Sequence, residues 1–209
     1  MFSGYSVDPD ADLREARVLL RKLRESHPRD PKVLATAAAE KLCLQGDRNE
    51  ARRLLKDALQ IDPNDADSAA ILGGLECYSG NTDNGLALIR GADTRAPSDR
   101  RVALWAWRRM ACELVDGNID GALSANDDAV ARNPNYVGFY RSEVVMQCFK
   151  GDRKAARRAA PRARWIDPNY GFERYTQTMD NVRWPGRLTM SAQAINDKTR
   201  ACLQDDYGT

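Results

Sequence analysis

The sequence predicts an all-α fold, a right-handed solenoid of antiparallel helix pairs stacked side by side. Four glycines recur along the chain, and each is followed seventeen residues later by a proline. Small residues also recur at fixed distances from these glycines and prolines. The intervals between the glycines are 34, 37 and 34 residues, close to the length of one two-helix repeat.

The glycines that define the repeat are Gly46, Gly80, Gly117 and Gly151, and the prolines that follow them are Pro63, Pro97, Pro134 and Pro168. A glycine ends a helix readily because it adopts the left-handed backbone conformation without a Cβ penalty. Asp or Asn follows each glycine and suits the N-cap of the next helix. Each proline stops that second helix. The predicted unit is therefore a helix, a glycine turn, a second helix and a proline turn.

Small residues lie five positions after each glycine and five before each proline, and they are Ala51, Gly85, Ala122, Ala156, Ala58, Ala92, Ala129 and Ala163. Small side chains at fixed sites let two helices approach closely, and larger apolar residues fill the remaining positions at helical spacing. The repeat glycines and prolines divide the chain into an N-terminal half repeat or capping helix, four repeats and C-terminal capping helices. The expected ranges are 1–29, then 30–168 as about 30–63, 64–97, 98–134 and 135–168, and finally 169–209.

The pattern resembles the tetratricopeptide repeat family, in which Leu-Gly in the first helix is followed by Ala, a large apolar residue and Pro. The best copy here reads Leu72-Gly73, Gly85, Ile89 and Pro97. The resemblance covers four full repeats, preceded by one helix that lacks its partner.

Some residues depart from the family pattern. Asn126 and Ala160 occupy the large apolar site, and the third repeat carries three extra residues between Pro97 and Gly117. Pro161 interrupts a second helix, where a proline removes a backbone hydrogen bond, so we expect looser packing or a kink there. After the repeats we expect helices at residues 170–179 and 188–203 that cap the array.

The resemblance implies a protein-binding module whose first helices line a concave groove. The family's groove positions fall on Thr36, Glu40, Cys43, Ala70, Gly74, Cys77, Tyr78, Trp107, Ala111, Arg141, Val145, Cys148 and Phe149. This lining is mostly apolar, with Trp107, Tyr78 and Phe149 as candidate anchors and Arg141 as its evident cation. Apolar pockets favour an extended or helical peptide as the partner.

Residues 165–175 are similar to the closing stretch of repeat domains at the C-termini of bacterial signalling proteins, including class III adenylate cyclases and winged-helix regulators. That similarity implies a regulatory module. Two alternatives remain open. One is a secretion-type chaperone, and the other is an RNA-binding helical-repeat protein.

Overall charge identifies no partner, because 32 basic and 30 acidic residues leave a formal net charge of +2. Basic stripes occur on the first helix, around Pro161, and on a later helix at Arg100, Arg101, Arg108 and Arg109. Acidic residues are nearly as frequent, however, and no aromatic platform interleaves the stripes. A protein or peptide partner is therefore favoured over nucleic acid. No apolar run reaches membrane-spanning length and residues 1–10 lack the features of a secretory signal, so we expect a cytoplasmic protein without a membrane partner.

We expect no enzyme, cofactor or metal site. The single histidine, His27, lies in a Ser-His-Pro turn, and no phosphate-binding loop, dinucleotide fingerprint, zinc-protease or serine-hydrolase motif occurs. Adjacent aspartates such as Asp127 and Asp128 do not face each other on a helix. The oligomeric state is left open.

The five cysteines are an odd number without a C-x-x-C pair, which disfavours a disulfide framework and fits reduced thiols in the cytoplasm. Cys43, Cys77 and Cys148 each lie three residues before a repeat glycine. Equivalent positions stack along one face of the repeats. We expect packed helices to hold these thiols about 10 Å apart, too far for a disulfide.

Overall fold

The computed structural model describes residues 8–166 and 192–203. Helix α1 (Pro9–Ser26) precedes four antiparallel helix pairs. The pairs are α2 (Pro31–Glu40) with α3 (Arg48–Ile61), α4 (Ala66–Tyr78) with α5 (Thr82–Arg95), α6 (Val102–Val115) with α7 (Ile119–Arg132), and α8 (Val137–Lys150) with α9 (Arg153–Ile166). A π-helical segment, η1 (Lys41–Gln45), extends α2, and α11 (Ala192–Leu203) follows the pairs. The predicted all-α fold of stacked helix pairs is confirmed.

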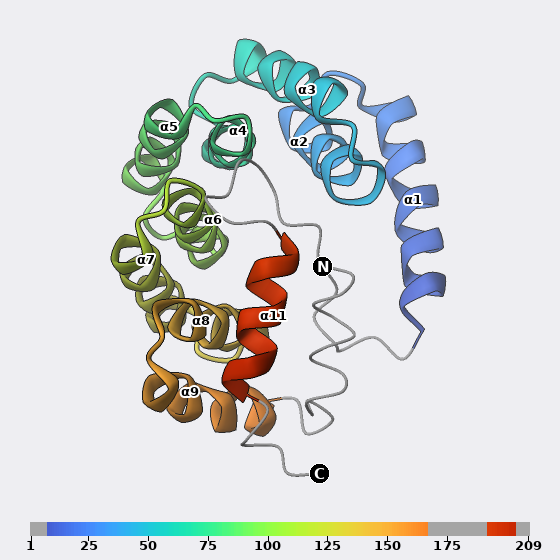
Figure 1. Cartoon of the computed structure of the whole chain (residues 1–209). Helices are drawn as coiled ribbons and strands as arrows, with labels where there is room; N and C mark the ends of the chain where they lie inside the picture. Colours follow the sequence, from blue (N-terminus) through green and yellow to red (C-terminus); the bar gives the residue numbers. More distant parts are fainter. Residues whose placement is uncertain (1–7, 167–191, 204–209) are drawn as a thin grey trace.

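The pairs follow one another along an arc (Figure 1). Helices α2, α4, α6 and α8 lie on the inner side of the arc, and α3, α5, α7 and α9 lie on the outer side. Each inner helix packs against its own outer partner and against the pair before it. The core is therefore a row of clusters shared by neighbouring helices, as expected for a solenoid.

The four repeat glycines adopt the predicted left-handed conformation, with φ values of 68° at Gly46, 90° at Gly80, 82° at Gly117 and 87° at Gly151. A residue with a Cβ would be strained at each of these positions. Helices α3, α5 and α7 each end two residues before a repeat proline. Glycine and proline therefore set the helix boundaries as predicted.

Three of the four predicted N-caps form. The side chains of Asp47, Asn118 and Asp152 each accept a hydrogen bond from a backbone N–H three residues further along the chain. Asn81 differs, because its side-chain amide donates to Glu76 Oε2 at 2.9 Å. Arg52 Nε donates to the other oxygen of Glu76, also at 2.9 Å. Although burial raises the pKa of Glu76, these two hydrogen bonds lower it below its ordinary value overall.

The small residues predicted at the helix contacts are buried in every pair. The closest approach occurs between α4 and α5, where a Cβ added to Gly73 would lie 2.6 Å from Gly85 O and 2.8 Å from Ile89 Cγ1. A Cβ on Gly85 would lie 2.5 Å from Gly73 O. The two backbones are therefore in direct contact, which only glycine permits at both positions.

The irregular repeats fold differently from expectation in one respect. Helix α9 continues through Pro161 to Ile166, so the predicted interruption is wrong. Pro161 is exposed, and water is therefore available to the groups that its ring leaves unpaired. Asn126 is fully buried at the family's large apolar site, and neither atom of its amide has a hydrogen-bond partner. An unpaired buried amide costs stability, so Asn126 stabilises its repeat less than a large apolar residue would at the same position.

The two ends of the array differ. In α1, Leu20 packs against the first core cluster, whereas Val18, Leu19 and Leu23 remain exposed. Helix α11 lies within the predicted final helix at 188–203, while the predicted helix at 170–179 falls outside the described residues. In the described ranges, no helix is long and apolar enough to span a membrane.

Adjacent glycines in α4 predict opposite effects of the same substitution. Gly73→Ala forces Cβ into the α5 backbone, and we expect the free energy of unfolding to fall by about 1–3 kcal/mol. Gly74→Ala meets only the Arg108 side chain, 3.8 Å away, and we expect no loss and a gain of up to about 1 kcal/mol from helix propensity. Urea unfolding followed by circular dichroism measures both. Equal destabilisation by the two variants would contradict the close approach.

Candidate functional site

The candidate site is the inner surface of the arc, formed by α2, α4, α6 and α8. On α2, Thr36 is exposed and its Oγ1 donates to the Lys32 carbonyl at 2.7 Å. Glu40 pairs with Arg17 of α1, with 3.4 Å between Nε and Oε1, and accepts a hydrogen bond from Gln45. The side chain of the third candidate in this repeat, Cys43, lies outside the described part of the chain. Helix α2 therefore contributes a polar section of the surface.

Helix α4 contributes small residues beside one large cation. Ala70 is fully buried within the core, and Gly74 lies against the side chain of Arg108 from α6. Arg108 is half-buried, and its Nε is buried without a hydrogen-bond partner. Tyr78 is half-buried one turn further along. The sequence places Arg108 in a basic stripe. It does not predict that the Arg108 side chain lies beside Gly74, one of the predicted groove positions.

Helices α6 and α8 are joined by Trp107, whose Nε1 donates to Ser142 Oγ at 3.0 Å. The indole also packs against the buried cluster that contains Met110 and Leu114. Ala111 and Arg141 are half-buried on the same two helices. Trp107 therefore links two repeats, a role that the sequence did not reveal.

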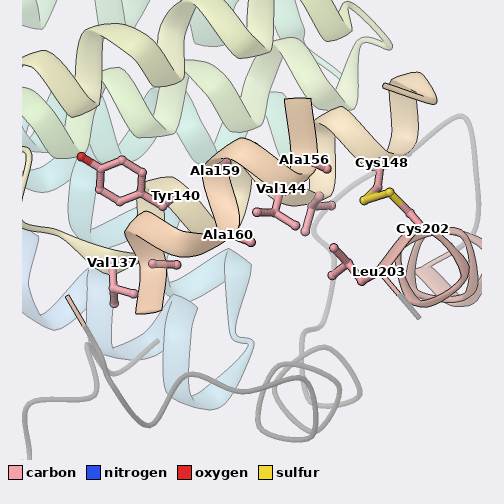
Figure 2. Packing of buried hydrophobic residues seen from close by; sticks show 11 residues of the cluster. Val137, Tyr140, Val144, Cys148, Ala156, Ala159, Ala160, Cys202 and Leu203 are labelled. Carbon is pink, nitrogen blue, oxygen red and sulfur yellow. A yellow bond between two sulfur atoms is a disulfide. The ribbon is translucent and has the colours of Figure 1, made fainter. Parts of the chain in front are cut away.

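The end of α8 is covered by α11 (Figure 2). Val145 and Cys148 are buried in a cluster that includes Cys202 and Leu203 of α11, and Phe149 packs against it. Lys198 Nζ lies 5.1 Å from the centre of the Phe149 ring. Val145, Cys148 and Phe149 are thus packed in a cluster to which the chain's own α11 contributes. Among the described residues, α11 packs against α8 and α9 and leaves the inner surface from α2 to the start of α8 uncovered.

Two disulfides correct the expectation of separate, reduced thiols. Cys77 is bonded to Cys112 and Cys148 to Cys202, with Cα–Cα distances of 5.3 Å and 5.6 Å. The expected spacing of about 10 Å applies to helix axes, and each Cα lies about 2.3 Å from its axis, so facing Cα atoms approach to about 5 Å. Cys77 lies three residues before its repeat glycine and Cys112 lies five residues before its own, so their positions in the two repeats are not equivalent. These two positions face each other across α4 and α6. The argument from reduced thiols to a cytoplasmic location therefore no longer holds.

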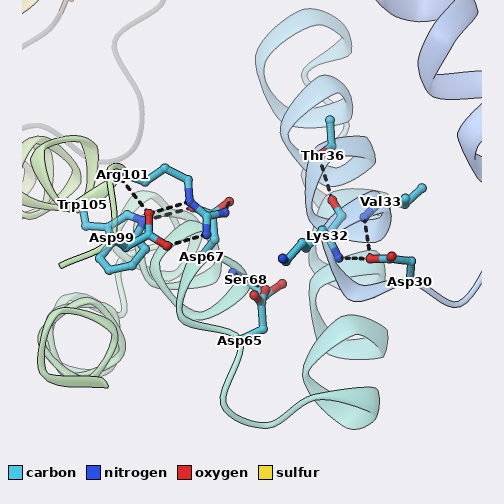
Figure 3. Close-up of polar contacts among 10 residues, drawn as sticks. All are labelled: Asp30, Lys32, Val33, Thr36, Asp65, Asp67, Ser68, Asp99, Arg101 and Trp105. Atoms are coloured by element: carbon cyan, nitrogen blue, oxygen red, sulfur yellow. Dashed lines mark hydrogen bonds and ion pairs between the residues drawn. The ribbon is translucent and has the colours of Figure 1, made fainter. Parts of the chain in front are cut away.

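A polar network fixes the start of α6 against α4 (Figure 3). Arg101 pairs with Asp67 at 2.9 Å and with Asp99 at 2.7 Å. Trp105 Nε1 donates to Asp67 Oδ1 at 3.0 Å, and the indole is buried. Hydrogen bonding from the Arg101 side chain lowers the pKa of Asp99 to about 2. Asp67 is thereby held in place at the edge of the inner surface.

Acidic groups on α7 and α8 have raised pKa values. Burial, followed by the charge of Asp127, raises the pKa of Glu143. Burial, followed by the charge of Asp128, raises that of Asp127. Within the described ranges, no three His, Cys, Asp or Glu side chains lie close enough together to hold a metal ion.

A second hollow, of about 840 Å³, lies between α1 and the first repeat. Its lining includes Arg17, Leu20 and Arg21 from α1, with Leu34 and Glu40 from α2. The sequence indicated the basic stripe of α1 but not this cavity, because the cavity depends on the angle between α1 and α2.

The Arg101 network predicts a pH dependence of stability. The pKa of Asp99 is lowered on folding from about 3.9 in an unfolded chain. Its stabilising contribution is therefore present above about pH 4 and is lost as the pH falls towards about 2. We expect Asp99→Asn to lower the melting temperature at pH 7 and to weaken its decline between pH 4 and 2. Thermal unfolding of this variant is compared with Asp83→Asn, an exposed control on α5. The same change in both variants would contradict the role of the network.

Comparison with known proteins identifies the repeats. Residues 10–75 match the family described as "Tetratricopeptide repeat". Superkiller complex protein 3 of Mus musculus is 27% identical over 125 residues, which cover 59% of this chain but only 8% of that protein. The match thus spans a small part of that relative's length.

Solved structures share the fold at low sequence identity. PilW, a type IV pilus biogenesis factor, superposes with a TM-score of 0.66 at 14% identity, over 94% of this chain and 87% of PilW. YrrB, described as a TPR protein with an unusual peptide-binding site, gives a TM-score of 0.54 at 17% identity, over 82% and 85% of the two chains. The similarity to adenylate cyclase and winged-helix modules finds no support in these comparisons. Residues 10–75 thus match the tetratricopeptide repeat family by sequence, and the described chain shares the fold of solved tetratricopeptide repeat structures.

Proposed function

We propose that the chain is a protein-binding scaffold that holds a partner segment along the inner surface of α2, α4 and α6. The observation that carries the proposal is the Arg108 side chain of α6, which lies over the small residue Gly74 of α4, 3.8 Å from the position of an added Cβ. The Arg108 side chain is half-buried with an unpaired Nε. A partly desolvated guanidinium of this kind binds carboxylates well.

The remaining surface supports a peptide that carries both apolar and acidic groups. Leu104 is exposed at the start of α6, and Tyr78 and Ala111 are half-buried further along. These side chains offer apolar contacts on either side of the cation. The shared fold with YrrB supports peptide binding by analogy. Binding alone, without a chemical step, accounts for this arrangement.

We further propose that such binding serves the regulatory part of a bacterial signalling protein, on the basis of the sequence similarity at residues 165–175. A free secretion-type chaperone is the alternative within the same binding class. The two differ in the partner, since a chaperone holds a segment of an exported protein and a regulatory module holds a segment of its own signalling pathway.

RNA binding remains a separate alternative because of α9. Its solvent face carries arginines and lysine, its buried face consists of alanines, and Trp165 is 67% exposed beside Arg162. An exposed aromatic ring next to a guanidinium is able to stack on a base. Binding to RNA loses affinity steeply as salt is added, whereas binding in a partly apolar groove loses much less.

Peptides selected from a random display library test the proposal. We expect Gly74→Leu to weaken the best peptide at least about tenfold, equal to about 1.4 kcal/mol, because the new side chain displaces the Arg108 side chain that lies over Gly74. The matched control is Gly91→Leu on outer helix α5, where an added Cβ also meets only an arginine side chain, Arg95 at 3.7 Å. Calorimetry measures both affinities, and circular dichroism verifies folding.

The control is expected to change affinity by less than about twofold, and Arg108→Gln is expected to weaken peptides that contain a carboxylate. Full affinity in a folded Gly74→Leu variant would sink the proposal. Binding of single-stranded RNA that disappears between about 50 and 200 mM salt, together with no selected peptide, would favour the alternative.

A further inference from the structure

The described contacts between helix α11 and the repeats include several made by its last turns. Thr199, Cys202 and Leu203 are its residues described as buried, and Asp197 and Lys198 are exposed. Outside the disulfide, the contacts include the Lys198 ammonium above the Phe149 ring and a hydrogen bond of 2.9 Å from Arg153 Nη2 to the Ala201 carbonyl. A twelve-residue helix is marginal without tertiary contacts. Its docking therefore depends strongly on the covalent link.

The two disulfides occupy different environments. Cys77 and Cys112 are fully buried between α4 and α6, in a cluster with Ile89 and Trp105. Cys202 lies in the final turn of a terminal helix. Thiol exchange requires access to a sulfur atom, and movement of α11 alone gives access to this bond. The Cys77–Cys112 bond becomes accessible only if two central helices separate.

The covered face belongs to the inner surface. Val145 and Phe149 are at positions that the family resemblance assigns to the groove. Val145 lies in the cluster that holds Cys202 and Leu203, and Phe149 packs against that cluster. In Figure 1, α11 lies on the inner side of the arc beside α8. A segment of the same chain thus occupies a place that is equivalent, along the array, to the inner faces of α4 and α6, against which α11 does not pack.

We propose that α11 is a reversible occupant of the inner face of α8, and that the Cys148–Cys202 disulfide determines whether it stays there. With the bond intact, α11 covers Val145 and Phe149. With the bond reduced, α11 leaves and the partner segment extends onto α8. This last step rests on the proposed binding function, whereas the release of α11 does not.

The redox step requires a dithiol reductant. One thiolate of the reductant attacks a sulfur of the Cys148–Cys202 bond, forms a mixed disulfide and releases the other cysteine as a thiolate. The second thiolate of the reductant then displaces the remaining cysteine. Two electrons pass to the protein, both cysteines take up a proton, and the reductant becomes a disulfide.

Amide hydrogen exchange of the full chain, read by mass spectrometry, tests the proposal without any partner. We expect peptides covering residues 197–203 and 144–150 to exchange at least about tenfold faster in Cys202→Ala, and in wild type treated with dithiothreitol, than in oxidised wild type. Cys112→Ala is the matched control, because it breaks the other disulfide and is expected to leave both peptides unchanged. Alkylation before and after reduction identifies the bonded thiols.

Two results would overturn the proposal. One is unchanged exchange of residues 197–203 when alkylation shows that Cys148 and Cys202 are reduced. The other is complete alkylation of both cysteines in the air-oxidised, folded protein without reductant. Failure to select a peptide affects only the proposed function, so the two outcomes are distinguishable.

Discussion

In each repeat the inner and outer helices approach closely because small residues occupy two fixed positions on the outer helix. Between α4 and α5, Gly85 of the outer helix meets Gly73 of the inner helix, backbone against backbone. Ala51, Ala122 and Ala156 occupy the position of Gly85 in the other pairs and are buried. Since the outer helix is held this close, the large apolar residues of both helices point into the gaps between pairs. The core that joins successive repeats follows from this geometry.

A chain built in this way interacts mainly with its sequence neighbours, so the inner helices form a continuous lining. Equivalent hydrogen bonds and ion pairs in successive repeats stabilise this lining. Glu76 binds Arg52 of the preceding outer helix and the Asn81 side chain, and Glu113 holds Arg90 and Asn118 in the same manner. These links between pairs keep the inner surface in one shape. A preformed surface binds a flexible segment with a smaller entropy cost than a mobile one does.

The features that could be predicted from the sequence depend on residues within a single repeat. Left-handed glycines, helix ends before prolines and buried alanines all follow from local backbone chemistry. The features that were missed depend on facing residues at different positions of adjacent repeats. Cys77 meets Cys112 and Trp107 meets Ser142 only because neighbouring inner helices are offset. A comparison of equivalent positions, which treats each repeat as a copy, does not reveal such pairs.

The position of α11 could not be predicted from the sequence for a similar reason. The sequence predicted a cap at the end of the array, but contact with Val145 and Phe149 depends on the side of α8 against which the helix packs. As a result, α11 covers part of the predicted groove on α8 and, among the described residues, leaves the inner faces of α4 and α6 uncovered. The binding surface proposed for the chain is therefore shorter than the four-repeat groove that the pattern indicates.

Mapping the footprint of a bound peptide tests the central claim most directly. Backbone and methyl NMR shifts recorded during a titration locate the contact without any substitution in the protein. The account predicts that the largest shifts lie at Thr36, Gly74, Tyr78 and Ala111 on the inner helices, with little change on α3, α5 and α7. Shifts concentrated on those outer helices, or on α9, would contradict an inner binding surface.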